Sequence, residues 1–163
     1  MINNYKKYII NYKYNDNIII LYIIDNIYLG SAYNASNKEL LQSYNIRYII
    51  NITNEISNHF PDDFVYFNFK IQDNNKDRLF DFLEESYRKI KEYQNNNDGA
   101  ILVHCFMGAS RSASILTYYI HKKFNLTIDD SIIFIKNKRE IINLTTLFYN
   151  QLLDIEKITK DIH

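Results

Sequence analysis

Apolar residues form short runs along the first two thirds of the chain, with helical stripes between and after them. Runs rich in Ile, Tyr and Phe are typical of buried strands, whereas the stripes of helices repeat every three or four residues. The runs predict strands over residues 18–24, 27–29, 47–52, 64–69 and 100–103. The stripes predict helices over residues 77–93, 110–123 and 146–160.

Polar caps mark two further helix starts. Ser36 stands three residues before Glu39, which is the spacing of a capping box. Thr127 is followed by Asp129 and Asp130, and carboxylates in the first turn interact favourably with the helix dipole. We therefore expect helices to begin at Ser36 and at Thr127.

The order of these elements predicts an α/β fold. Strands alternate with helices and are followed by a run of helices, which fits a central mixed, mostly parallel sheet flanked by helices. A length of 163 residues suits one compact domain, which we expect to span residues 17–163. Residues 1–16 would form a separate N-terminal segment. An amphipathic helix over residues 3–14 and a frayed tail are the two alternatives there.

Composition narrows the class of protein. Hydrophobic residues make up 47% of the chain, and 19 basic residues balance 19 acidic ones. This composition supports a sizeable core and gives no indication of a nucleic-acid or membrane partner. No run approaches the roughly 20 apolar residues of a membrane span, and the N-terminal residues lack the apolar core of a signal peptide. One cysteine excludes an internal disulfide and favours a reducing compartment.

Residues 104–112 carry the candidate chemistry. They read HCFMGASRS, follow the predicted strand at 100–103 and open the predicted helix at 110–123. A tight loop between a strand and a helix N-terminus turns backbone N–H groups inward and forms a cradle for an anion. Gly108 allows a loop conformation that a side chain would resist. We expect a phosphate to be bound by Phe106, Met107, Gly108, Ala109, Ser110 and Arg111.

Cys105 lies at the base of this cradle, and Arg111 follows six positions later. The helix dipole, the loop amides and the guanidinium favour the nucleophilic thiolate, and the guanidinium can bind two phosphoryl oxygens at once. We expect Cys105 to form a cysteinyl-phosphate that water then hydrolyses. Ser112 would donate a hydrogen bond to the departing sulfur, and His104 would orient the loop. The alternative for a lone cysteine is a buried, inert thiol.

The segment HCFMGASRS resembles the His-Cys-x5-Arg-Ser signature of the protein tyrosine phosphatase superfamily, and its Ser-Arg-Ser ending resembles the dual-specificity branch. The segments DNIYLGSAYNASNKELL and YIINITNE and the stretch from 121 to 153 are also similar to that family. The resemblance covers roughly residues 25–157 and implies the dual-specificity phosphatase core fold over residues 17–163. It also implies hydrolysis of phosphotyrosine and phosphoserine/threonine in proteins, with no cofactor and no metal.

The chain resembles the small, single-domain members of this family, including poxvirus-type ones. In those relatives an N-terminal helix pairs two copies, so the resemblance implies a homodimer formed through residues 3–14. The implied partner is a phosphorylated protein, and the implied location is the cytoplasm, that of a host if the protein is viral.

Asp73 is the first candidate for the general acid that protonates the leaving oxygen. It ends the segment FNFKIQD, 32 residues before the cysteine, at the loop where the family places its acid. Asp77 is the second candidate, with a helix N-cap as its alternative role. Asp62 and Asp63 are expected to be turn residues.

The chain departs from the family between residues 138 and 148. The family often has Arg-Pro, Pro-Asn and Gly-Phe there, whereas KREIINLTTLF lacks both prolines and the glycine. The sequence therefore leaves open how this turn packs behind the phosphate loop. Phe106 and Met107 are bulkier than the residues often found in the loop, and they either shape one wall of the site or simply fill space.

Two other functions compete with that of a protein phosphatase. A phosphatase of phosphoinositides would often have Lys in the loop, and one of RNA 5′ ends tends to be more basic. A phosphoprotein-binding module without catalysis is opposed by the presence of Cys105, Arg111 and Asp73 together. A metal site is not expected, because the histidines outside the motif lack the spacing of metal ligands. They are His59, His121 and His163.

Overall fold

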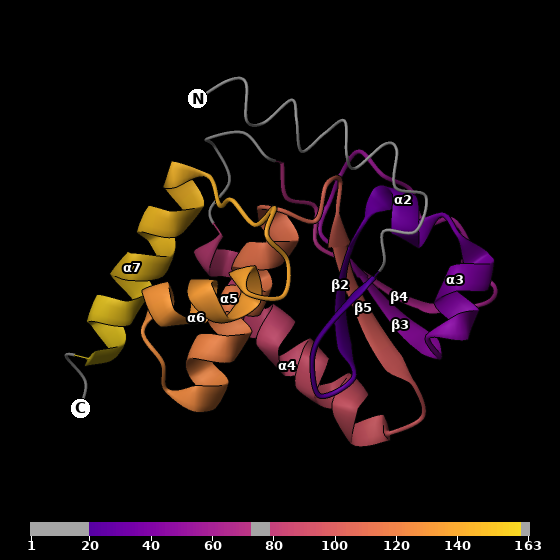
Figure 1. Ribbon diagram of the computed structural model, residues 1–163, viewed down its shortest axis with the longest axis horizontal. Coiled ribbons are helices and arrows are strands. Elements are labelled where there is room, and N and C mark those ends of the chain that lie inside the picture. The colour runs from indigo at the N-terminus through magenta and orange to yellow at the C-terminus, as the bar shows by residue number, and fades with distance from the viewer. Residues whose placement is uncertain (1–19, 73–78, 161–163) are drawn as a thin grey trace.

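The computed structural model describes residues 20–72 and 79–160, in which five strands form one sheet in the order β1-β2-β5-β3-β4 (Figure 1). β1 is antiparallel to β2, and the other neighbouring strands are parallel. The predicted mixed, mostly parallel sheet is thereby confirmed. The helix expected over residues 3–14 lies outside the described residues. The strands are β1 (Leu21–Ile24), β2 (Ile27–Ser31), β3 (Ile46–Asn51), β4 (Val65–Asn68) and β5 (Ala100–Cys105).

Helices cover both faces of the sheet. Four of them, α4 to α7, pack on one face, and α2 and α3 pack on the other (Figure 1). The sheet is therefore the middle layer of three, as an α/β fold requires. The helices are α2 (Ala32–Ala35), α3 (Lys38–Ser43), α4 (Phe80–Asn96), α5 (Arg111–Phe124), α6 (Ile128–Lys136) and α7 (Thr146–Lys160).

The central strand β5 is buried at all six of its positions. Ile101 and Val103 belong to the core beneath α4 to α7, whereas Ala100 and Leu102 belong to the core beneath α2 and α3. Side chains alternate between the faces of a strand, so a strand covered on both sides is apolar at consecutive positions. This burial fixes the position of the segment that follows, residues 104–112.

The helix starts differ from the sequence prediction at one of the two caps. The cap of α3 is Asn37, whose side-chain oxygen accepts the N–H of Leu40 at 3.0 Å. Ser36 instead ends α2, a one-turn helix that the apolar pattern did not reveal. The expectation that Ser36 caps this helix with Glu39 is therefore wrong, because Asn caps a helix as well as Ser does. The cap of α6 is confirmed, since Thr127 Oγ1 accepts the N–H of Asp130 at 3.0 Å.

Among the residues that the structure describes, the N-cap residue of α4 makes no side-chain capping bond. This residue is Leu79, whose N–H donates to Oε1 of Gln151 in α7 at 2.7 Å. Asp77, the residue expected to cap this helix, lies outside the described residues. Across residues 20–72 and 79–160, no helix has the length and apolar character to cross a membrane.

Candidate active site

Cys105 is the last residue of the central strand, and its neighbours come from both adjacent parallel strands. Ser31 at the end of β2 is its partner on one side. On the other side, Asn51 at the end of β3 pairs with His104, and the N–H of Ile52 donates to the His104 carbonyl at 2.9 Å. Ligands of open α/β sheets bind beyond the carboxyl ends of the strands, and Cys105 lies at that edge.

The sulfur of Cys105 is buried and accepts two hydrogen bonds. The backbone N–H of Gly108 lies 3.2 Å from Sγ, and the hydroxyl Oγ of Ser112 lies at the same distance. Cys105, the loop that follows and the first turn of α5 thus close around the sulfur. Donors aimed at a sulfur stabilise its anionic form, and Ser112 stands where it can donate to a thiolate that leaves a phosphorus atom.

Gly108 is the residue on which the loop closure depends. Its φ is +68°, a left-handed conformation that favours glycine. A Cβ at this position would lie 2.4 Å from the carbonyl oxygen of Gly30 in β2. The loop can therefore approach β2 closely only because residue 108 has no side chain.

Arg111 is the first residue of α5, and its side chain is held by an acidic partner from another loop. Nη1 and Nη2 donate to the two carboxylate oxygens of Glu55 at 2.9 and 2.5 Å, and Nη1 also donates to the carbonyl of Ile71 at 3.0 Å. Arg111 is 3% exposed. The hydrogen bond from Arg111 is the main cause that lowers the pKa of Glu55, and burial opposes it. The carboxylate thus fixes the plane of the guanidinium.

The loop that carries Glu55 is itself tied to the end of β3. Thr53 Oγ1 donates to Asn51 Oδ1 at 2.7 Å and accepts the N–H of Ile56 at 3.1 Å. The Asn51 amide donates to the Ile56 carbonyl at 2.8 Å. These bonds close a turn around Glu55, so the carboxylate is presented to Arg111 by a fixed backbone.

The turn behind the loop packs closely although it lacks the family's prolines and glycine. Arg139 is 3% exposed, and its Nε and Nη2 donate to the carbonyls of Gly108 and Met107 at 3.0 and 3.1 Å. The N–H of Asn143 donates to the Ala109 carbonyl at 2.9 Å. These bonds hold the carbonyls of the loop outward, which is the orientation that leaves its amides facing the cradle.

His104 is neutral in the folded protein. It is 1% exposed, and burial lowers its pKa to about 4. Its Nδ1 lies 3.3 Å from the carbonyl oxygen of Cys105, so this nitrogen is the donor. A neutral histidine bonded to the backbone fits the predicted role of orienting the loop.

Sequence reasoning proposed several further site residues. The loop residues Phe106 to Ser110 lie between β5 and α5 as expected, with Phe106 exposed and Ala109 and Ser110 buried. Asp73 and Asp77, the two candidates for the acid, lie outside the described residues. Glu55 and Arg139 were missed as site residues, because each acts through a contact that sequence spacing does not reveal.

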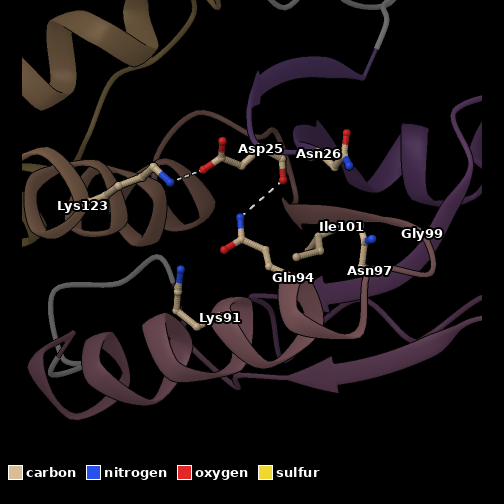
Figure 2. Close-up of a pocket in the computed structure, with 8 residues that line it drawn as sticks. All are labelled: Asp25, Asn26, Lys91, Gln94, Asn97, Gly99, Ile101 and Lys123. Carbon is tan, nitrogen blue, oxygen red and sulfur yellow. Dashed lines mark hydrogen bonds and ion pairs between the residues drawn. The ribbon is translucent and has the colours of Figure 1, made fainter.

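A separate cavity of about 270 Å³ lies at the opposite end of the sheet, where β2 and β5 begin (Figure 2). In it Lys123 pairs with the carboxylate of Asp25, and the Gln94 amide donates to the Asp25 carbonyl at 3.3 Å. Tyr119 donates to Gln94 Oε1 at 3.1 Å from within the core. These bonds tie the β1–β2 turn to α4 and α5, so we assign the cluster a structural role.

The family model of the dual specificity phosphatase catalytic domain matches residues 27–158. Since this match covers most of the sequence, the chain belongs to the dual specificity phosphatase catalytic domain family. The resemblance found in the segment HCFMGASRS is thereby confirmed.

Relatives with this domain are similar to the chain over most of its length. The protein phosphatase Slingshot of Drosophila melanogaster is 38% identical over 130 residues, which are 80% of this chain and 12% of that protein. Dual specificity protein phosphatase 1 of Arabidopsis thaliana is 35% identical over 144 residues, or 88% of this chain and 72% of that protein. The chain therefore spans only a small part of the Slingshot proteins that it matches.

Solved structures share the fold. Human DUSP28 superimposes with a TM-score of 0.79 at 22% identity, over 88% of this chain and 99% of that chain. The human tyrosine phosphatase-like serine/threonine/tyrosine-interacting protein gives a TM-score of 0.78 at 27% identity, over 85% and 96% of the two chains. The predicted fold class is therefore confirmed.

Proposed function

We propose that this protein is a dual-specificity protein phosphatase that hydrolyses phosphotyrosine and phosphoserine/threonine through a cysteinyl-phosphate intermediate. The observation that carries the proposal is the environment of the Cys105 sulfur. A backbone N–H and a hydroxyl point at it, and it lies at the N-terminal end of α5. An inert core cysteine needs no such donors, so these bonds favour the nucleophile over the alternative of a buried thiol.

In the first step the thiolate of Cys105 attacks the phosphorus of the substrate in line with the leaving oxygen. The S–P bond forms, the P–O bond to the side chain of the substrate breaks, and Asp73 gives its proton to the leaving oxygen. Arg111 and the loop amides stabilise the three equatorial oxygens. A guanidinium has five N–H donors, so a carboxylate and a phosphoryl group can bind it together.

In the second step a water molecule attacks the phosphorus of the cysteinyl-phosphate. Asp73, now ionised, takes a proton from the water, and the S–P bond breaks to release inorganic phosphate. Ser112 donates to the departing sulfur, 3.2 Å away in the present structure. His104 stays neutral and holds the backbone of the nucleophile.

The test of this proposal is turnover of phosphopeptides by the wild type and by Cys105→Ser. Phosphotyrosine and phosphothreonine peptides should both release phosphate, and Cys105→Ser should bind them without turnover. Phosphoinositides and 5′-phosphorylated RNA serve as competing substrates, and preferential hydrolysis of either would contradict a protein phosphatase. Binding without turnover by the wild type would support a phosphoprotein-binding module, an alternative that the "phosphatase-like" interacting relative makes worth testing.

The role of Asp73 needs a test of its own. Asp73→Asn should slow hydrolysis of phenyl phosphate, whose leaving oxygen needs a proton, by about 10²–10⁴-fold. It should slow an aryl phosphate with a much more acidic phenol far less. Equal losses with both substrates would contradict a general acid, and the same selective loss in Asp77→Asn would shift the role to Asp77.

We also propose a cellular location and an oligomeric state for the enzyme. The lone cysteine favours a reducing compartment, so we place the protein in the cytoplasm. We also propose that the N-terminal segment pairs two copies. Size-exclusion chromatography with and without residues 1–16 tests this, and an unchanged mass on truncation would contradict it.

A further inference from the structure

Two large aromatic side chains are exposed next to the phosphate cradle. Phe106 directly follows Cys105 and is 56% exposed, and Tyr33 in α2 is exposed to the same degree. Exposure of this size is unusual for Phe, which is mostly buried in folded proteins. The expectation that Phe106 fills space within the protein therefore does not describe its position.

The backbone places these two residues on the same rim of the site. Ser31 is the strand partner of Cys105, so the residues that follow each strand leave the sheet side by side. The N–H of Ala32 donates to the carbonyl of Phe106 at 3.0 Å. Tyr33 is the next residue after Ala32, so one hydrogen bond links the segments that carry the two rings.

Two other exposed aromatic rings, those of Tyr22 and Phe124, have ring partners. Tyr22 packs edge to face against Tyr28, and Phe124 lies 6.1 Å from Phe134. Within residues 20–72 and 79–160, neither Phe106 nor Tyr33 has a ring contact of this kind. Their faces are thus available to a ring that arrives with the substrate.

We infer that Phe106 and Tyr33 form an aromatic rim that binds the phenyl ring of phosphotyrosine and makes the enzyme prefer it to phosphothreonine. This inference rests on the proposed function and adds a substrate preference of the enzyme to it. With the phosphate in the cradle, the ring of phosphotyrosine occupies the mouth of the site, where it can pack against aromatic side chains. The side chain of phosphothreonine is too short to place an apolar group of that size there.

The test is a ratio of affinities, measured with two peptides that differ only in the phosphorylated residue. Binding of the phosphotyrosine and phosphothreonine peptides is measured in the Cys105→Ser background by calorimetry. Phe106→Leu keeps an apolar side chain and Tyr33→Ala lies outside the loop, so the two variants perturb the rim independently. Each should lower the preference for the phosphotyrosine peptide about threefold to tenfold, the range expected from one aromatic pair.

Phe124→Ala is the matched control, because this exposed phenylalanine lies at the opposite end of α5 from the cradle. It should leave the ratio unchanged. The inference would be overturned if the wild type bound the two peptides with equal affinity or bound neither of them. It would also be overturned if both rim variants lost the same affinity for the two peptides. Because binding is measured without turnover, failure of the wild type to hydrolyse either peptide contradicts the proposed function separately.

Discussion

Both carboxylate oxygens of Glu55 accept hydrogen bonds from the guanidinium of Arg111, although 56 positions separate the two residues in the sequence. Arg111 is buried and Glu55 is half exposed, so the pair connects the floor of the site to its surface. A guanidinium without this partner would sample other orientations, and an orientation error is costly in a site that works by positioning.

Glu55→Gln should lower kcat/KM for phosphopeptides by about tenfold, because a neutral amide loses one of two charge-assisted hydrogen bonds to Arg111. Glu85→Gln removes the same charge from the exposed surface of α4 and is the matched control. Steady-state kinetics with both variants check this. Equal kinetics for the two variants would show that Glu55 does not position Arg111.

The lowered pKa of Glu55 has a consequence for stability at acid pH. The unfolded chain protonates this carboxyl at a higher pH than the folded protein does, so the ion pair contributes stability above its ordinary pKa of 4.5. That contribution is lost as the pH falls below 4.5 and through the lowered value. Denaturant titrations at several pH values should show a smaller acid loss in Glu55→Gln than in the wild type.

His104 should make the free energy of unfolding decrease as the pH falls from neutral into the acid range. Burial lowers its pKa from 6.5 to about 4, so the unfolded chain binds a proton over this interval that the folded protein excludes. The free energy of unfolding should decrease by about 3 kcal/mol as the pH falls through this range. In His104→Asn the free energy of unfolding should depend less steeply on pH over this range, whatever its absolute value. An equally steep dependence in the variant would assign the effect to other groups.

Gly108→Ala should be both less stable and nearly inactive. A left-handed alanine costs about 1–2 kcal/mol, and its Cβ would also force the loop away from Gly30. Asn125 has a φ of +53° at the end of α5, so Asn125→Ala tests the left-handed strain at a site away from the cradle. Thermal unfolding and aryl phosphate turnover should show a larger loss for Gly108→Ala on both measures.

Arg139→Lys should lower kcat clearly while changing the melting temperature little. A lysine keeps the charge, but its single ammonium cannot reproduce the two hydrogen bonds to the Met107 and Gly108 carbonyls. We expect a loss of about tenfold in kcat, by analogy with other groups that orient a reacting centre. Arg88→Lys on the surface of α4 is the control. A fall in melting temperature without a change in kcat would mean that Arg139 supports the fold alone.

Much of the architecture follows from local patterns. The runs around Ile49 and Leu102 predict central strands because both faces of these strands are covered, and the apolar stripe of α5 predicts a helix that is packed on most sides. The segment 104–112 predicted the candidate nucleophile and the loop around it, since strand, loop and helix are consecutive in the chain. The one-turn helix α2 escaped prediction, because four residues carry no helical period.

The contacts of the site across the chain could not be predicted in the same way. Glu55 reaches Arg111 only because β3 and β5 are neighbours in the sheet, and neighbouring parallel strands are set by tertiary packing. Arg139 reaches Met107 and Gly108 across 31 and more positions for a similar reason. Sequence spacing indicates which groups one element presents, whereas contacts between distant elements depend on the assembled fold.

Because β5 is buried on both faces, two parts of the candidate site should open to solvent at very different rates. Amide protons of a central strand exchange with solvent only in global unfolding, whereas a half-exposed loop opens locally at much lower free energy. The backbone of Cys105 should therefore exchange on the slowest timescale of the molecule. The turn around Glu55 can open and close many times while the sulfur of Cys105 stays in place. The guanidinium of Arg111 can therefore be released by Glu55 without unfolding of the core.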